Sequence, residues 1–215
     1  MRLIPTIFLT ALALLPALPA QAGRIRGTLH IGPVSAARGD AASAQSVRDA
    51  VIYVEHVPAK VEKKLANPGF LFFRSKPRLP RVVQMDRRFN PRVISIVAGS
   101  RVAFHNMDQV WHNTFSVSAT RTFDLGKYPP GWADTIAFER PGVVNLHCDI
   151  HSSMVGFVVV TPNHAFTRPD SAGTFRLPSL PPGRYTVRAV HPRHGELRRD
   201  VVMPKRGDLK LDLRF

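Results

Sequence analysis

The stretch VVNLHCDIHSSM, residues 143–154, joins an apolar segment typical of a buried strand to a short loop rich in metal-binding side chains. Cys148 is the only cysteine in the chain, and His151 and Met154 follow it at intervals of three residues. A thiolate, an imidazole and a thioether favour a soft metal ion, and one Cys, two His and a weak axial Met form the ligand set of blue copper sites. The stretch therefore predicts a copper site at a strand end, and this site needs a second histidine from elsewhere.

His112 is expected to be that second histidine. It follows a segment with apolar residues alternating at Val102 and Phe104, and it precedes another alternating segment from Thr114 to Val117. Two such strands would bring His112 to a strand end beside the cysteine loop. The neighbouring Asn113 carries a side-chain amide that can hydrogen-bond to the same loop and hold a ligand in its orientation.

Four motifs resemble the small blue copper proteins of the cupredoxin family: Asn106-x-Asp108-x₃-His112-Asn113, Phe123-Asp124-Leu125-Gly126, Pro141-Gly142-Val143 and Cys148-x₂-His151-x₂-Met154-x-Gly156. The short spacing from Cys to Met is similar to that of amicyanin rather than plastocyanin. Nearly all of the expected mature chain resembles bacterial plastocyanin-like proteins, often labelled methylamine-utilization proteins, in which such a domain is joined to a carboxypeptidase-regulatory-like β-module. The resemblance implies one type 1 copper ion held by His112, Cys148 and His151, with Met154 as the axial ligand.

Each ligand also has a simpler interpretation. Cys148 can act as a small buried hydrophobic residue, and Met154 can pack ahead of the apolar segment at residues 156–160. Zinc is the rival metal, because one Cys, two His and a water can hold it, although Met is not among its usual ligands.

The other histidines are expected to be non-ligands. His147 adjoins Cys148 and would point to the opposite face of a strand, and His105 is interpreted in the same way as a residue outside the site. Three further histidines are expected at the protein surface: His164, His191 and His194. The sequence has no HExxH or GxSxG motif and no His-x-His pair typical of trinuclear copper clusters, so we expect an electron-transfer protein rather than an enzyme.

The N-terminus predicts export. Arg2 precedes an apolar, Ala/Leu-rich stretch that continues to Leu18, and Ala20-Gln21-Ala22 follows as a small-x-small cleavage site. The apolar stretch is short and interrupted by proline, which argues against a membrane span. We therefore expect a signal peptide at residues 1–22 and a soluble periplasmic protein, in which copper would occupy a thiol that is otherwise a liability in an oxidising compartment.

Composition predicts an all-β fold, because the chain has 19 prolines, 14 glycines and no long helical period. We expect a cupredoxin Greek-key β-sandwich at residues 82–161. Its strands are expected near residues 93–97, 102–104, 113–117, 135–138, 143–148 and 156–160.

A second, transthyretin-like or carboxypeptidase-regulatory-like β-sandwich is expected to combine residues 23–57 with residues 162–215. Both parts alternate apolar and polar residues, and the C-terminal part is too short for a core of its own. The cupredoxin domain would then be an insertion. Residues 58–81 are expected to be a basic and aromatic connecting segment with one short helix at residues 59–65.

The chain is strongly basic, with 30 Lys and Arg residues against 15 Asp and Glu residues, and this excess of positive charge indicates which partners it could bind. In an exported protein this excess favours an acidic redox partner or an anionic membrane surface over nucleic acid. A basic cluster follows the aromatic run at residues 70–73 and is interpreted either as a docking patch or as a solvated face; it comprises Arg74, Lys76, Arg78, Arg81, Arg87, Arg88 and Arg92.

Together these features predict a copper protein that carries single electrons between redox partners. The alternatives are a periplasmic copper trafficking or storage protein, which would use the same soft ligands but release the metal, and a non-redox binding module of the cell envelope.

Overall fold

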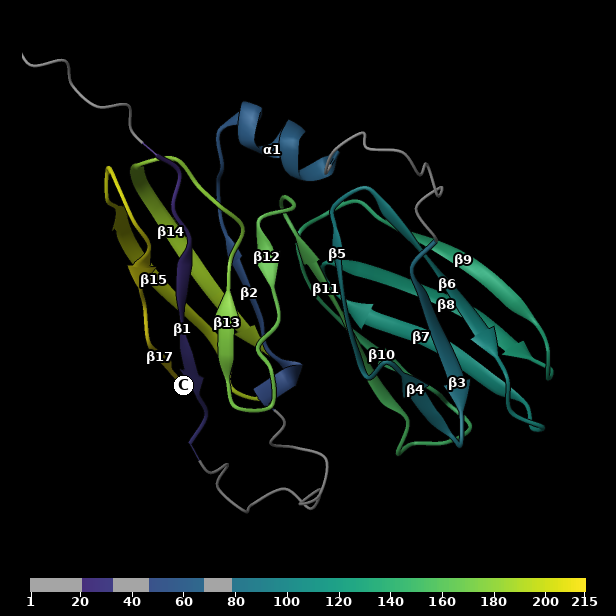
Figure 1. Cartoon of the computed structure of the whole chain (residues 1–215). Helices are drawn as coiled ribbons and strands as arrows, with labels where there is room; N and C mark the ends of the chain where they lie inside the picture. The colour runs from purple at the N-terminus through teal and green to yellow at the C-terminus, as the bar shows by residue number, and fades with distance from the viewer. Residues whose placement is uncertain (1–20, 33–46, 68–78) are drawn as a thin grey trace, which may run out of the picture.

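The structure, a computed structural model, describes residues 21–32, 47–67 and 79–215. Within these residues nearly all regular structure is β-strand, which confirms the all-β class, and the strands form two β-sandwiches (Figure 1). The predicted signal at residues 1–22 falls almost wholly outside the described residues. The aromatic run at 70–73 and three members of the basic cluster, Arg74, Lys76 and Arg78, also lie outside them.

The central sandwich spans residues 81–161 and has two sheets. The strand order of its first sheet is β5 (Val93–Val97), β11 (Val155–Thr161), β10 (Gly142–His147), β7 (His112–Ser118) and β8 (Arg121–Tyr128). The strand order of its second sheet is β4 (Arg88–Asn90), β3 (Arg81–Met85), β6 (Ser100–Asn106) and β9 (Ala133–Phe138). The pairs β5–β11 and β3–β6 are parallel and the other pairs are antiparallel, so the chain crosses between sheets as well as turning in hairpins.

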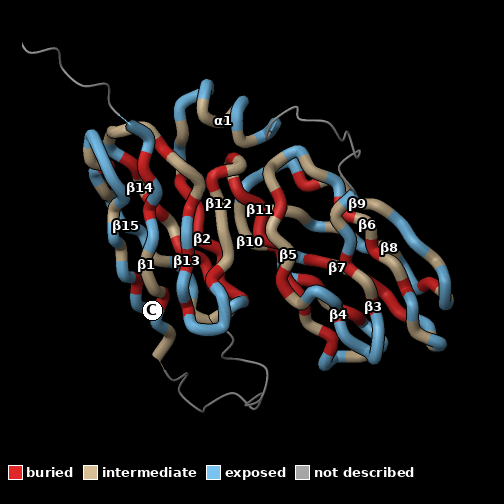
Figure 2. The backbone as a smooth tube through the Cα atoms, in the orientation of Figure 1, coloured by how far each residue is buried: buried red, intermediate tan, exposed pale blue. Residues whose placement is uncertain are grey.

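Alternating side chains fill the space between these two sheets. On β6, Val102 and Phe104 are buried while Arg101 is exposed, and on β10 Val144 and Leu146 belong to the same core. This period of two residues is the pattern expected of strands with one face on a core. Figure 2 shows buried residues following the strands of both sandwiches.

The outer sandwich contains the remaining strands. The strand order of one sheet is β12 (Phe166–Thr167), β2 (Val51–Val54), β14 (Gly183–His191) and β15 (Gly195–Met203). The other sheet places β1 (Ile25–His30) between β13 (Thr174–Arg176) and β16 (Leu209–Lys210), with β17 (Leu213–Arg214) also paired to β1. Its first two strands therefore precede the central sandwich in the chain, and the others follow it.

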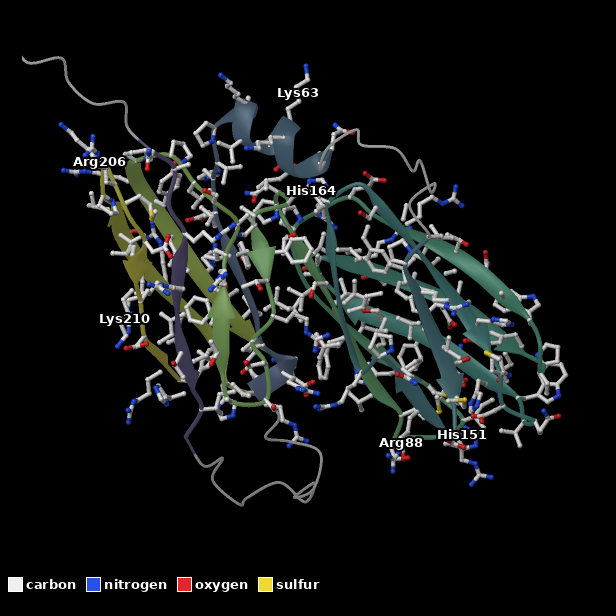
Figure 3. All side chains as sticks on the ribbon, viewed as in Figure 1. Lys63, Arg88, His151, His164, Arg206 and Lys210 are labelled. Carbon is white, nitrogen blue, oxygen red and sulfur yellow. The ribbon has the colours of Figure 1, made fainter. Side chains whose placement is uncertain are left out.

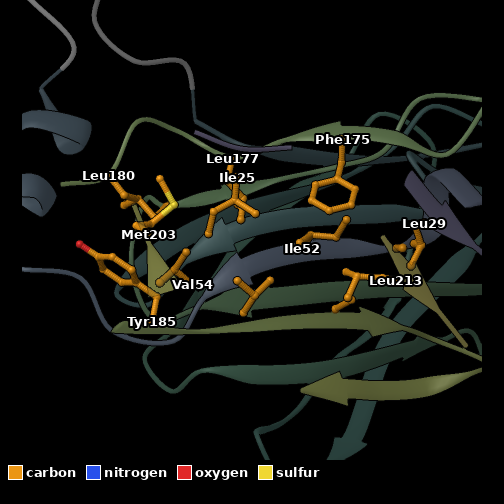
Figure 4. Packing of buried hydrophobic residues seen from close by; sticks show 14 residues of the cluster. Ile25, Leu29, Ile52, Val54, Phe175, Leu177, Leu180, Tyr185, Met203 and Leu213 are labelled. Carbon is orange, nitrogen blue, oxygen red and sulfur yellow. The ribbon is translucent and has the colours of Figure 1, made fainter. Parts of the chain in front are cut away.

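The core of the outer sandwich draws on both of these parts (Figure 4). Ile25 and Leu29 of β1 pack in one cluster with Ile52 of β2, Phe175 of β13 and Leu213 of β17. Each of these side chains is at most 2% exposed. Neither end of the chain supplies this core without the other.

A smaller apolar cluster joins the two sandwiches. Val51 of β2 packs there with Val93 of β5 and Phe157 of β11. Beside it, Arg92 forms an ion pair with Asp49 and lies over the Phe157 ring, with its guanidinium carbon 5.3 Å from the ring centroid. Arg92 thus stabilises the junction between the two sandwiches. Its expected place in a basic docking cluster on the surface was wrong.

Helical structure is confined to two short elements of the described chain, the 3-10 turn η1 (Val47–Asp49) and the helix α1 (Ala59–Ala66). The helix occupies the expected place. Its Glu62 accepts hydrogen bonds from the backbone and ring nitrogens of His164, which hold the helix against the chain that follows β11. No helix among the described residues is both long enough and apolar enough to cross a membrane.

Candidate metal centre

The candidate metal ligands meet at one end of the central sandwich because two neighbouring strands run in opposite directions. His112 is the first residue of β7, and Cys148 follows the last residue of β10. The two strands pair antiparallel, with His147 opposite Phe115, so the start of one lies beside the end of the other. His151 stands in the loop that leads from β10 to β11.

The three donor atoms form a compact group. Cys148 Sγ lies 3.9 Å from His112 Nδ1 and 4.0 Å from His151 Nδ1, and the two Nδ1 atoms are 3.2 Å apart. All three atoms lie within 4.8 Å of one another. A thiolate and two imidazoles converging in this way are a ligand set that copper and zinc both accept.

Solvent reaches this group from one side. His112 is fully buried and Cys148 is 4% exposed, whereas His151 is only partly buried. Desolvation lowers the pKa of His151, and the nearby His112 and Arg87 lower it further, although the Asp108 carboxylate opposes the shift. A lowered pKa favours the neutral imidazole, which is the form that binds metal.

Met154 is 1% exposed and belongs to the same buried cluster as Cys148. Its backbone N–H donates to the His151 carbonyl oxygen at 2.9 Å, which closes the loop that carries both residues. The position suits either an axial ligand or a packing residue, and the axial role stays a prediction.

Asn113 links the ligand loop to two strands. Its Nδ2 donates to Asp124 Oδ1 at 2.7 Å and to the Gly126 carbonyl at 3.0 Å, both on β8. Its Oδ1 accepts from the Asp149 N–H at 3.4 Å, and its own backbone N–H points at Cys148 Sγ, also at 3.4 Å. The side chain therefore ties β7, β8 and the cysteine loop together.

Asp108 is a site residue that sequence reasoning missed. Its Oδ2 lies 2.7 Å from His112 Nε2, on the side of the ring away from the donor group. Burial alone would raise the pKa of Asp108, but hydrogen bonds from Arg87, His112 and Asp86 hold that pKa below its ordinary value. The only sequence signal was its place four residues before His112 in the motif that carries the family resemblance.

A second missed feature is a closed triangle of hydrogen bonds among Tyr128, Gln84 and Thr114, next to the candidate ligands. Tyr128, which lies opposite His112 in the β7–β8 pair, donates to Gln84 Oε1 at 2.6 Å. Gln84 Nε2 donates to Thr114 Oγ1 at 3.0 Å, and the Thr114 hydroxyl lies 2.5 Å from the Tyr128 oxygen. Burial raises the pKa of Tyr128 to about 12, and the nearby Cys148 adds to the shift although the two hydrogen bonds oppose it. All three polar groups are thus satisfied in a core where unpaired groups would be costly.

The rim around His151 is unusually apolar. Seven large hydrophobic residues are exposed in the described chain, and four of them lie at a strand end or in loops on this side of the sandwich: Met85 at the end of β3, and Met107, Trp111 and Ile150 in loops. Arg87 and Arg88 are also exposed, and Figure 3 labels Arg88 and His151 at the same end of the central sandwich.

Other sequence expectations had different outcomes. The group of converging donors among the described residues includes neither His105 nor His147, and the His147 ring packs instead near Phe115, with centroids 5.7 Å apart. The expectation of a surface position for His191 was wrong, because this residue is 1% exposed. It closes the β14–β15 hairpin, where its Nδ1 accepts from the Arg193 N–H.

Comparison with known proteins gives a likeness of structure alone. No protein-family model matches the chain, and no curated protein matches it. Similar solved structures include a Cu(I) amicyanin variant with methionine replaced by alanine (20% identity, 38% of this chain, 80% of that chain, TM-score 0.36). Others are a reduced amicyanin variant with tryptophan replaced by tyrosine (20% identity, 40% and 86% covered, TM-score 0.37) and a purple cupredoxin from Nitrosopumilus maritimus (23% identity, 38% and 99% covered, TM-score 0.35).

Proposed function

We propose that this chain is an exported type 1 copper protein of the cupredoxin class that carries single electrons between redox partners. The observation that carries the proposal is the convergence of Cys148 Sγ, His112 Nδ1 and His151 Nδ1 within 4.8 Å at the end of a β-sandwich. Met154, buried in the same cluster, would supply the weak axial thioether. A zinc site would ordinarily use a fourth Cys or His, or a water, in place of that methionine.

Copper, when bound, supplies a one-electron couple. The protein's part is to keep the donors in one arrangement that suits both oxidation states. His112 and Cys148 are anchored at strand ends, and Asn113 bonds to the loop between the ligands. The apolar cluster beneath them, which includes Phe104 and Leu146, excludes water from the inner side.

Electron exchange is proposed to occur through the edge at His151. It is the most exposed of the three donor residues, and the exposed Met107 and Trp111 provide apolar contact area at the same end of the sandwich. Arg87 and Arg88 on the same rim favour a partner with an acidic docking surface. The burial of His112 and Cys148 supports retention of the ion, which a storage or trafficking protein would have to release.

Two further features belong to the proposal. Residues 1–22 are an export signal, and the mature protein works in an oxidising compartment such as the periplasm, where its single, free and buried thiol would be occupied by copper. The outer sandwich is a non-catalytic, carboxypeptidase-regulatory-like module that holds the copper-binding unit through the Val51–Val93 junction.

The decisive test is addition of one equivalent of Cu(II) to the mature chain, followed by visible and electron-paramagnetic spectra. An intense thiolate-to-copper charge-transfer band is expected, because Cys148 is the only possible thiolate. Cys148→Ser should stay folded and lose the band. A colourless wild-type protein, or a Cys148→Ser protein that keeps the band, would contradict the proposal.

A further inference from the structure

We propose that Asp108 is a positioning residue for the metal centre, which fixes the proton of His112 on Nε2 and so presents an unprotonated Nδ1 to the metal. The inference rests on the proposed copper site, and it adds a residue that acts through a ligand rather than on the ion.

The first step concerns the two nitrogens of one buried ring. Asp108 Oδ2 lies 2.7 Å from His112 Nε2, and an ionised carboxylate only accepts hydrogen bonds, so Nε2 carries the proton. His112 has no exposed surface, and in the structure the carboxylate is the partner that its Nε2 contacts. The other nitrogen, Nδ1, faces Cys148 Sγ at 3.9 Å and His151 Nδ1 at 3.2 Å.

The second step is that the carboxylate is itself held from the opposite side. The backbone N–H of Asp86 donates to Asp108 Oδ1 at 2.7 Å, and that of Arg87 donates to Oδ2 at 2.9 Å. The Asp108 N–H donates in turn to Asn106 Oδ1 at 3.0 Å. With both oxygens engaged, the carboxylate cannot rotate away from His112.

The third step explains why two N–H groups point at one carboxylate. Asp86 and Arg87 form the two-residue turn between β3 and β4, and both have positive φ, 55° and 54°. Non-glycine residues rarely take this conformation, and pairs of them occur in tight hairpins. The turn of one hairpin thereby positions a carboxylate, and the carboxylate positions the ring of His112.

The arrangement is asymmetric between the two histidines. The ion pairs of the described residues include Asp108 with His112, but none with His151. A carboxylate on the far nitrogen makes an imidazole a stronger donor and fixes its orientation. We therefore expect Asp108 to stabilise the oxidised ion more than the reduced one and to lower the reduction potential.

The test compares Asp108→Asn and Asp108→Ala with Asp149→Asn as the control. The control removes the same charge from an exposed residue next to Cys148, but its side chain has no contact with His112. Long-range proton–nitrogen spectra of the metal-free proteins report the tautomer of His112. Competition titrations with Cu(II) and voltammetry report affinity and potential.

Wild type and Asp149→Asn should show the proton of His112 on Nε2, and both Asp108 variants should lose this single tautomer. Cu(II) affinity of the Asp108 variants should fall about 10- to 100-fold. Each tenfold preferential loss for Cu(II) over Cu(I) raises the potential of a one-electron couple by about 59 mV.

Asp108 variants with wild-type tautomer, affinity and potential would overturn the inference, and so would a wild-type His112 protonated on Nδ1. The second result needs no variant, so it decides the matter even if the Asp108 variants fail to fold. A wild-type protein that binds no copper would defeat the proposed function instead, and the tautomer spectrum would still report on Asp108.

Discussion

The Nδ1 atoms of His112 and His151 lie 3.2 Å apart, yet the two rings differ in their access to solvent. His112 enters from a strand and is fully buried, whereas His151 stands on a loop at the surface. Of the two histidines, His112 is therefore enclosed by the core, whereas His151 is accessible to molecules in solution.

This difference predicts unequal rescue by added imidazole. His151→Gly should leave a cavity open to solvent, so that exogenous imidazole restores the copper spectrum on titration. His112→Gly should respond weakly, because its cavity is closed by the surrounding core and the Asp108 carboxylate. Equal rescue of both variants in a visible titration would show that the inner ligand is not enclosed.

Met154 should tune the potential with little effect on stability. Met154→Leu is a volume-conserving change at a side chain that is 1% exposed, so we expect it to cost less than about 1.5 kcal/mol. If the thioether is the axial ligand, Met154→Leu raises the reduction potential and Met154→Gln lowers it. Met203→Leu, an equally buried change in the outer sandwich, is the control and should leave the potential unchanged. Identical potentials in all three variants would identify Met154 as a packing residue.

Tyr128 predicts a loss of stability in strong alkali. The phenol has a pKa of about 12 when folded, against an ordinary value of 10.0, so folding favours the protonated form. That stabilisation, on the order of 2 kcal/mol, is complete below pH 10 and disappears as the pH rises through 12. Denaturant unfolding of the metal-free protein should give wild type a larger free energy of unfolding than Tyr128→Phe at pH 8. This difference in free energy should become smaller above pH 10. A constant gap would mean that Tyr128 does not ionise on unfolding.

The basic rim predicts a salt-dependent encounter with an acidic partner. Exposed charges are screened over about 8 Å at physiological ionic strength, and complementary charge mainly raises the association rate. Reversing Arg87 and Arg88 to Glu should slow bimolecular electron transfer to an acidic cytochrome at low salt. Reversal of Arg184 and Arg206, two exposed residues of the outer sandwich, should leave the rate unchanged; Figure 3 labels Arg206 on that sandwich. A rate insensitive to salt and to both reversals would remove the acidic partner from the proposal.

The sequence predicted the strands whose side chains alternate strongly. Strands occur in all six expected places of the central sandwich, including β5 at Val93–Val97. The expectation omitted β3, β4 and β8, and in β8, Arg121–Tyr128, Asp124 and Gly126 interrupt the apolar pattern. Those two residues instead accept hydrogen bonds from Asn113, and no local propensity reports such a use.

The convergence of His112 with Cys148 and His151 could be expected because their chemistry is rare and two of the three lie close in the sequence; their role as metal ligands stays a prediction. What holds them could not be predicted, because it depends on contacts between distant segments. The turn at Asp86 and Arg87 lacks the Asn-Gly or Asp-Gly signal of a tight hairpin. Its backbone N–H groups bind the carboxylate of Asp108, which is 22 positions from Asp86 in the sequence. Gln84 and Tyr128 are 44 positions apart and meet only once the two sheets have packed.

The interrupted connectivity of the outer sandwich imposes an order of events on a chain that emerges from its N-terminus. Asn163 bonds to the Val54 carbonyl across 109 positions, and β2 pairs with β12 and β14, which come later still. All strands of the central sandwich lie in one continuous stretch, so this unit can fold while its neighbour is still incomplete. Until β12 and β14 have been synthesised, the four residues of β2 have no strand to pair with, although all four are buried in the folded protein. The first two strands of the outer sandwich therefore wait longer for their partners than the strands that carry His112 and Cys148.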